Sequence, residues 1–219
     1  MDHNIGRLID ALKAMEILDN TFILFLPDNG AGNAAINNTP DTGLGSRNFW
    51  VSNEQSCGNV SNTPYRYYKA FAHEGGIITP LIVHWPNGID KKGLISHQPI
   101  HIIDIVPTLL GLSKTVYPET FGNEKLVPIT GKSILPLING AKKDQVMVMF
   151  WQHEGNQAVR IGDWKLVKKN KNPWESYDLK TDPTELSVLK NIKSDLIDSL
   201  KINWQTSAKK VGVKDWPVK

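Results

Sequence analysis

The sequence predicts a mixed α/β fold that is followed by a small antiparallel sheet with a terminal helix. Two apolar runs, residues 21–27 and 77–86, are predicted to be buried strands of the α/β part. Farther along, β-branched and aromatic runs separated by turn residues are typical of an antiparallel meander, and Leu and Ile at helical spacing over 184–208 predict the helix. We therefore expect part of an α/β domain with parallel strands over residues 1–140 and a smaller β subdomain over residues 141–219.

The amino-terminal part contains a predicted helix, a strand and a long polar segment. Apolar residues recur at helical spacing from Ile5 to Met15, which predicts an amphipathic helix. The strand over 21–27 is followed by a stretch from Asn29 to about Thr63 that is rich in Asn, Gly, Ser and Thr. Connections of this length are uncommon in compact domains, and they tend to be functional or disordered.

The middle of the chain alternates between short helical segments and loops. A helical or turn segment over 63–76 is expected to precede the strand over 77–86. Helical spacing recurs over 101–112, where Pro107 is compatible only with a first turn or a kink. Residues 128–140 are expected to form a loop with one or two short helical turns.

Length and composition exclude several classes of protein. A chain of 219 residues can bury a sizeable core, and its net charge of +3 is too small and too scattered to indicate nucleic-acid binding. No stretch approaches the roughly 18 to 20 apolar residues of a membrane span. The single Cys57 excludes an internal disulfide framework and a cysteine-rich zinc site. We expect a globular protein with no nucleic-acid partner and no membrane span.

An acid, an amide and a glycine stand at the end of the first predicted strand, as Asp28, Asn29 and Gly30. In open α/β sheets, ligands bind beyond the carboxyl ends of the strands. A carboxylate and an amide oxygen suit a hard cation such as Ca²⁺ or Mg²⁺, although two ligands do not complete its coordination shell. The other interpretation is a simple turn, because these residue types tolerate unusual backbone dihedrals.

A second candidate site contains Lys69, five positions before the sequence Glu74-Gly75-Gly76. A lysine offers a compact positive charge with three donors, which suits an oxyanion such as sulfate or phosphate. The two glycines allow the backbone to pass close to a ligand or to turn sharply. The alternatives are a solvated surface role for Lys69, a packing role for His73 and a structural hydrogen-bonding role for Glu74.

His153 and Glu154 stand beside two aromatic residues in the stretch 150–158. This stretch does not form a zinc-protease motif, because no histidine follows four residues after His153. Aromatic groups next to polar side chains are suited to line a pocket for a ring-shaped substrate. An aromatic cluster at the edge of a sheet is the alternative interpretation.

The order of these motifs resembles that of the sulfatase family, most of all its bacterial arylsulfatase-like members, which belong to the alkaline phosphatase superfamily. The resemblance covers essentially the whole chain. It rests on the stretches "MDHNIGRLIDALKAMEILDNTFILFLPDNG", "NTPYRYYKAFAHEGGIITPLIVHWPNGI", "HIIDIVPTLLGL", "AVRIGDWKLV", "WESYDLKTDPTE" and "KKVGVKDW". The resemblance implies the carboxyl-terminal part of an alkaline-phosphatase-like sulfatase fold.

The resemblance also implies roles for the candidate residues. Asp28 and Asn29 match two calcium ligands of sulfatases, so Ca²⁺ is the expected metal. Lys69 matches the lysine that binds the sulfate group, where it would neutralise charge that develops on sulfate and on the leaving oxygen. His73, His153 and Glu154 match positions near the substrate and are expected to contact it.

The family's nucleophile is not expected in this chain. Sulfatases use a formylglycine that is made from the Cys or Ser of a Cys/Ser-x-Pro-x-Arg motif, and its hydrate acts as the activated nucleophile. Cys57 has neither the proline nor the arginine of that motif. The amino-terminal Asp-Asp pair that completes the calcium shell is also missing. We therefore expect the carboxyl-terminal half of a sulfatase, which is inactive alone.

The expected activity of the full-length parent is hydrolysis of the sulfate ester of a small molecule or a carbohydrate. One alternative is a phosphonate or phosphate monoester hydrolase of the same superfamily, and another is a truncated remnant without catalysis. At Ile78, many relatives carry Arg or Ser, which bears on the substrate class. The resemblance suggests a periplasmic or extracellular location.

Overall fold

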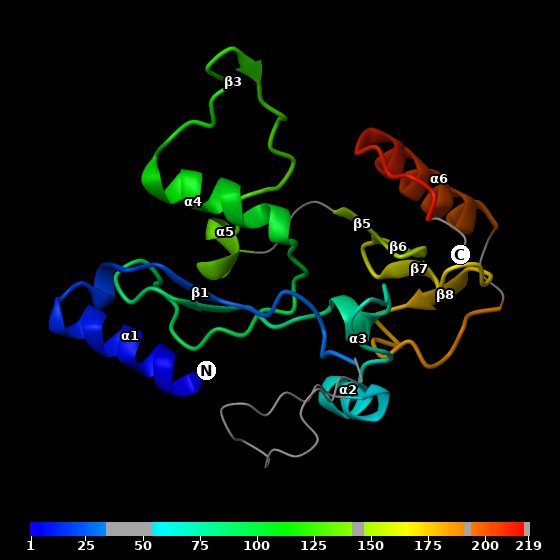
Figure 1. Ribbon diagram of the computed structural model, residues 1–219, viewed down its shortest axis with the longest axis horizontal. Helices are drawn as coiled ribbons and strands as arrows, with labels where there is room; N and C mark the ends of the chain where they lie inside the picture. Colours follow the sequence, from blue (N-terminus) through cyan, green and yellow to red (C-terminus); the bar gives the residue numbers. More distant parts are fainter. Residues whose placement is uncertain (34–53, 142–146, 191–193, 217–219) are drawn as a thin grey trace, which may run out of the picture. The chain divides into compact units, whose positions relative to one another are not determined.

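The structure, a computed structural model, describes residues 1–33, 54–141, 147–190 and 194–216 (Figure 1). Its contacts divide into two compact units. Unit 1 consists of Met1–Phe25 with Leu81–Gln145, and unit 2 consists of Leu26–Pro80 with Val146–Lys219. The predicted domain boundary near residue 140 stays a prediction, because units of contact do not define the domains of a longer protein.

Unit 1 begins with the predicted helix and holds a two-stranded sheet. Its elements are α1 (Asp2–Ala14), the 3-10 turn η1 (Leu18–Asn20), β1 (Ile23–Phe25), β2 (Ile82–His84), the 3-10 turn η2 (Ile102–Asp104), α4 (Ile105–Ser113), the hairpin of β3 (Thr120–Phe121) and β4 (Glu124–Lys125), and α5 (Leu135–Ile138). The expectation of parallel strands is wrong for β1 and β2, which pair antiparallel with Phe25 opposite Ile82. The chain leaves unit 1 after Phe25 and returns at Leu81, so the end of β1 lies beside the start of β2.

The helix over 101–112 is confirmed as η2 and α4, with Pro107 inside the first turn of α4. The Asp104 carboxylate is fully buried and accepts hydrogen bonds from the backbone N–H of His101 (3.0 Å) and of Lys132 (2.8 Å). The Thr108 hydroxyl accepts from the backbone N–H of Ile134 at 3.0 Å. These bonds fasten the loop before α5 to the start of α4.

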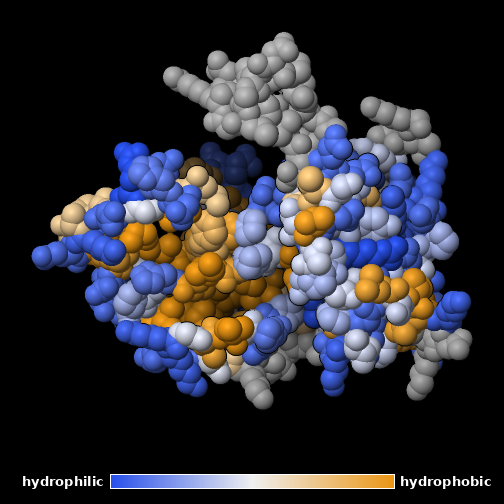
Figure 2. All heavy atoms as spheres, turned by 90° about the horizontal axis from the view of Figure 1, so that it is seen from below, coloured by the Kyte–Doolittle hydropathy of each residue, from blue (hydrophilic) through white to orange (hydrophobic). Residues whose placement is uncertain are grey.

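Much of the apolar surface of unit 1 is exposed. In α1, no side chain is buried. The apolar Leu8 of this helix is 61% exposed, and Met15, directly after the helix, is 66% exposed. Ile102, Val106 and Leu109 are exposed in or beside α4. Figure 2 shows apolar side chains gathered on part of one face of the molecule. Exposed apolar surface is typical of protein or membrane contacts, ligand-binding grooves and aggregation-prone surfaces.

Unit 2 contains the predicted antiparallel meander and the terminal helix. Its elements are α2 (Gln55–Asn62), α3 (Glu74–Ile77), the strands β5 (Val148–His153), β6 (Asn156–Ile161), β7 (Trp164–Lys168) and β8 (Glu175–Asp178), and α6 (Ser194–Lys210). The four strands follow the order β5-β6-β7-β8, each antiparallel to the next. In the long polar stretch, α2 was not predicted, and residues 34–53 lie outside the described residues.

The two faces of this sheet are covered by different parts of the chain, because successive side chains of a strand point to opposite faces. Val159 and Leu166 pack with Leu200 of α6 in one buried cluster. Their neighbours Ala158 and Val167 pack with Ala72 in another. The second face therefore holds the segment that carries the candidate site.

No helix in the described ranges is both long enough and apolar enough to span a membrane.

Candidate functional site

The strand tip Asp28–Gly30 is packed directly against the segment that leads into β2. The Gly30 N–H donates to the Gly76 carbonyl at 3.0 Å. A β-carbon at Gly30 would lie 1.9 Å from the Gly75 carbonyl oxygen, so only glycine fits at this approach. Asp28 is exposed and Asn29 is half-buried, with the Asn29 Nδ2 donating to the Gly30 carbonyl at 2.9 Å. The amide oxygen of Asn29 is thus not occupied by that bond.

Lys69 lies on a turn that is hydrogen-bonded to the same strand tip. Its backbone N–H donates to the Ala31 carbonyl at 3.0 Å. The Asn62 side chain bridges the two segments, because its Oδ1 accepts from the Ala31 N–H and its Nδ2 donates to the Tyr67 carbonyl, both at 3.0 Å. The Lys69 side chain is exposed. The antiparallel return of the chain into β2 therefore brings the segments of Asp28, Asn29 and Lys69 together.

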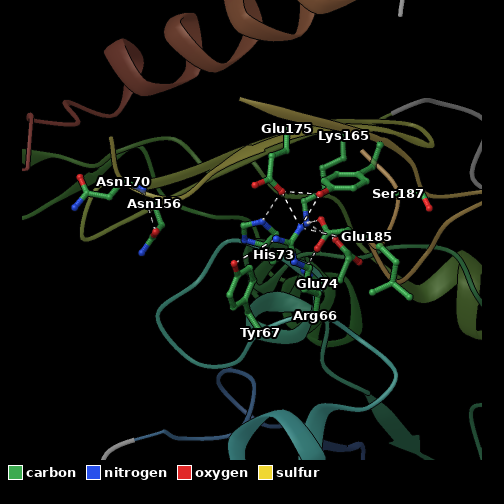
Figure 3. Close-up of polar contacts among 12 residues, drawn as sticks. Arg66, Tyr67, His73, Glu74, Asn156, Lys165, Asn170, Glu175, Glu185 and Ser187 are labelled. Carbon is green, nitrogen blue, oxygen red and sulfur yellow. Dashed lines mark hydrogen bonds and ion pairs between the residues drawn. The ribbon is translucent and has the colours of Figure 1, made fainter. Parts of the chain in front are cut away.

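Unit 2 also contains a buried ion cluster (Figure 3). Lys165 of β7 has no exposed surface, and its Nζ lies 2.6 Å from the Glu74 Oε1 and 2.7 Å from the Glu185 Oε1. The Glu185 Oε2 accepts from the Glu74 backbone N–H at 2.7 Å. These three residues join α3, β7 and the segment after β8, which lie far apart in the sequence.

A second group of polar residues adjoins the first (Figure 3). The Glu175 Oε2 accepts hydrogen bonds from the Arg66 Nη1 at 2.8 Å and from the Tyr177 hydroxyl at 2.6 Å. The His73 Nε2 lies 3.4 Å from the same oxygen, and the imidazole is 1% exposed. Since a carboxylate only accepts, we assign the proton of neutral His73 to Nε2.

Burial and neighbouring charges shift the pKa values in this cluster. Burial lowers the pKa of His73 to about 4, and the positive charges of Lys165 and Arg66 add to the shift. Burial raises the pKa of the Glu185 carboxyl more than Lys165 lowers it. Burial opposes ionisation of Glu175 too, but the Tyr177 hydrogen bond and the Arg66 charge keep its pKa below the usual value. His73 is therefore neutral at neutral pH.

His153 and Glu154 lie at the tip of the β5–β6 hairpin. The two residues of its turn, Glu154 and Gly155, have φ of 48° and 78°, as a two-residue hairpin turn requires. Both His153 and Glu154 are exposed, and they line a shallow cavity of about 420 Å³. Phe150, Gln152, Val211, Val213, Lys214 and Trp216 complete its lining.

The predicted site residues thus fall into three places in unit 2. Asp28, Asn29 and Lys69 share adjoining segments, whereas His153 and Glu154 lie on the hairpin. His73 is buried in the ion cluster, which favours the packing interpretation that the sequence left open. Four members of this cluster were not predicted from the sequence: Arg66, Lys165, Glu175 and Glu185. One signal was available, since Lys165 shares the strand face of apolar Val167.

In the part of the chain that the structure describes, no three His, Cys, Asp or Glu side chains gather in a way that could hold a metal ion. Asp28 and Asn29 offer two adjacent oxygen ligands of the type that calcium binds, whereas a calcium ion takes six to eight. The two residues fit part of such a shell.

Comparison with known proteins gives two matching family profiles. The profile described as sulfatase matches residues 1–115, and that described as N-sulphoglucosamine sulphohydrolase, C-terminal, matches residues 64–209. An uncharacterized sulfatase of Schizosaccharomyces pombe is 31% identical, over 99% of this chain and 43% of its own length. The choline-sulfatase of Rhizobium meliloti is 28% identical, over 86% of this chain and 31% of its own length. The chain therefore spans less than half of these relatives.

Solved structures of similar fold include an enzyme in complex with its substrate, D-glucosamine-2-N,6-O-disulfate. It has a TM-score of 0.66 at 22% identity, covering 98% of this chain and 39% of its own. The phosphonate monoester hydrolase of Agrobacterium radiobacter has a TM-score of 0.55 at 19% identity, covering 96% of this chain and 38% of its own. At these identities the likeness concerns the fold alone.

Proposed function

The chain belongs to the sulfatase family of sulfuric ester hydrolases, and from that premise we propose that it provides the sulfate-binding lysine and two calcium ligands of a sulfatase active site. Its fold is the alkaline-phosphatase-like fold of solved sulfatases, of which it carries the carboxyl-terminal part. Hydrolysis would release sulfate and an alcohol. The remaining parts of the site would come from residues that correspond to the rest of the longer relatives.

One observation supports this proposal: the Lys69 N–H donates to the carbonyl of Ala31, two residues after Asn29, and the Asn62 side chain bridges the same two segments. Lys69 is exposed there and would neutralise charge on the sulfate oxygens as the ester bond breaks. The Asp28 carboxylate and the Asn29 amide oxygen would hold Ca²⁺. When bound, the ion would supply positive charge beside the sulfate group. No nucleophile of the formylglycine type is proposed within this chain, since Cys57 lies on α2 outside the required motif.

The proposed substrate class is a sulfated saccharide or small molecule. It is supported by the neighbour bound to D-glucosamine-2-N,6-O-disulfate and by the choline-sulfatase relative. His153 and Glu154 would contact the part of the substrate beyond the sulfate. Export to the periplasm or the cell exterior stays a prediction from the family.

A second candidate function is favoured by the likeness to a phosphonate monoester hydrolase. That enzyme class would use the same lysine and metal ligands on a different anion. Assaying 4-nitrophenyl sulfate beside a 4-nitrophenyl phosphonate separates the two activities. A truncated remnant without catalysis is the third candidate, and it is distinguished by the absence of both activities.

The proposal is tested first on the source DNA and then on its product. We expect the reading frame to continue upstream of Met1 through a Cys/Ser-x-Pro-x-Arg motif and an Asp-Asp pair. The longest product should hydrolyse a sulfate ester, lose activity with a chelator and regain it with Ca²⁺, whereas the 219-residue chain alone should be inactive. A stop codon and a ribosome-binding site just ahead of Met1 would instead favour the remnant.

Replacing Lys69 with alanine in the active product should lower kcat/KM for the sulfate ester on the order of a hundredfold, because a fixed positive charge at the sulfate is lost. The matched control is Lys180→Ala, which removes an exposed lysine of the same unit. The assay is release of 4-nitrophenol at neutral pH. Equal rates for the two variants would refute the role of Lys69.

A further inference from the structure

We propose that Asn156 is the positioning residue that holds the Lys69 turn in its active geometry, an inference that rests on the proposed role of Lys69 in sulfate binding. Asn156 is the first residue of β6 and is 7% exposed. Its Nδ2 donates to the Ala70 carbonyl at 2.8 Å, and its Oδ1 accepts from the Asn170 N–H at 3.2 Å. One buried amide thereby fastens the residue after Lys69 to the four-stranded sheet.

The turn needs such a contact because its backbone is strained on both sides of Lys69. Tyr67 has a φ of 65° and Ala70 a φ of 79°, although neither is glycine. Residues other than glycine disfavour positive φ, so the surrounding structure must hold Tyr67 and Ala70 in this conformation. Asn62 holds the Tyr67 carbonyl, and Asn156 holds the Ala70 carbonyl. Lys69, between these two anchors, has its backbone direction set by them.

Asn156 also links two parts of the proposed site. It pairs with His153 across the hairpin turn, so the strand that begins at Asn156 carries the hairpin tip. Through the bond to Ala70, the position of Lys69 is tied to the tip that presents His153 and Glu154. Loss of this bond should therefore displace the lysine relative to the remainder of the substrate, without removing any group that touches the sulfate.

Two variants separate the contacts of Asn156. Asn156→Asp is isosteric and keeps an acceptor for the Asn170 N–H, but it has no donor for the Ala70 carbonyl. Asn156→Ala removes both contacts and adds no charge. The matched control is Asn170→Gly, which tolerates the φ of 47° at that position and leaves the bond to Ala70 in place.

Hydrogen–deuterium exchange of the 219-residue chain provides the first readout. In both Asn156 variants, we expect the amides of Lys69 and Phe71 to exchange roughly tenfold faster, while the amides of β6 and β7 keep their protection. The control should match the wild type. Unchanged exchange at Lys69 and Phe71 in the Asp variant would overturn the inference, whether or not the chain is part of a sulfatase.

The second readout is a double-mutant cycle in the catalytically active product. We expect KM for the sulfate ester to rise roughly tenfold in both Asn156 variants, and Asn156→Ala to have no further effect on kcat/KM in a Lys69→Ala background. Additive losses, or a loss in the Asp variant alone, would show that Asn156 does not act through Lys69. If the wild type hydrolyses no sulfate ester, the proposed function fails, and the exchange experiment alone decides whether Asn156 holds the turn.

Discussion

Replacement of Lys165 with methionine is expected to lower the free energy of unfolding by about 3–5 kcal/mol, because it leaves two buried carboxylates without their counter-charge. The Nζ lies 2.6 Å from Glu74 and 2.7 Å from Glu185, and all three side chains are at most 5% exposed. Methionine fills a similar volume, so the loss reflects charge far more than packing. Since typical domains are stable by 5–15 kcal/mol, the change is large.

Urea unfolding followed by tryptophan fluorescence measures this effect on the 219-residue chain. Lys180→Met is the control, and as an exposed substitution it should lie within about 0.5 kcal/mol of the wild type. Adding Glu74→Gln and Glu185→Gln to Lys165→Met should restore part of the loss, because the uncompensated negative charges are then gone. A Lys165→Met midpoint equal to that of Lys180→Met would contradict the buried ion cluster.

The local motifs of the proposed site could be predicted from the sequence. The buried ion cluster of the same unit could not. Asp28, Asn29 and Lys69 occur in short motifs whose chemistry is local. Lys165 and Glu74 are 91 positions apart in the sequence, and Glu74 and Glu185 are 111 positions apart. No periodicity connects residues at such separations. Lysine side chains are almost never fully buried, so the residue type alone predicts an exposed Lys165.

The fold was predictable where one local pattern decides the structure. The meander of β5–β8 follows from alternation and turn residues, and Pro107 in a first turn follows from proline geometry. The terminal helix was predicted over 184–208 but begins at Ser194, because Asp182 instead accepts the N–H groups of Leu186 and Ser187 in a turn.

The antiparallel pairing of β1 and β2 depends on where the chain travels between them, through unit 2 and back. That path is set by tertiary contacts such as the bond from Gly30 to Gly76. The apolar residues of the two strands do not determine whether the strands pair parallel or antiparallel. The same path brings Lys69 to the strand tip, so the pairing error and the unforeseen geometry of the site have a single cause.

The stability of the chain should fall by about 2 kcal/mol between pH 7 and pH 5 through His73 alone. Its pKa is lowered from 6.5 to about 4 by burial and by the nearby positive charges of Lys165 and Arg66. Between pH 6.5 and about pH 4, His73 therefore binds a proton in the unfolded chain but not in the folded chain. The contribution of neutral His73 to the free energy of unfolding is fully present above pH 6.5 and is lost as the pH falls toward 4. It amounts to about 3 kcal/mol in total.

His73→Gln isolates this effect, since glutamine does not titrate and can still donate to the Glu175 carboxylate. We expect the slope of unfolding free energy against pH between 5 and 7 to be smaller in the variant, measured by urea unfolding at each pH. The half-buried His101, whose pKa is also lowered, is unchanged in both proteins and cancels in the comparison. Parallel slopes for wild type and variant would show that His73 titrates as it does in the unfolded chain.

Protonation of His73 would also reach the proposed site, because the imidazole stacks edge-on against Tyr67 at 4.6 Å between ring centroids. A charged imidazole is disfavoured at this position because the side chain is 1% exposed, so the segment from Tyr67 to His73 should loosen before the sheet unfolds. Relative to the intrinsic exchange rate at each pH, hydrogen exchange at pH 5 should therefore accelerate first at Lys69 and Phe71, ahead of β6 and β7. In His73→Gln this early acceleration should be absent, and its persistence would place the acid-sensitive group elsewhere.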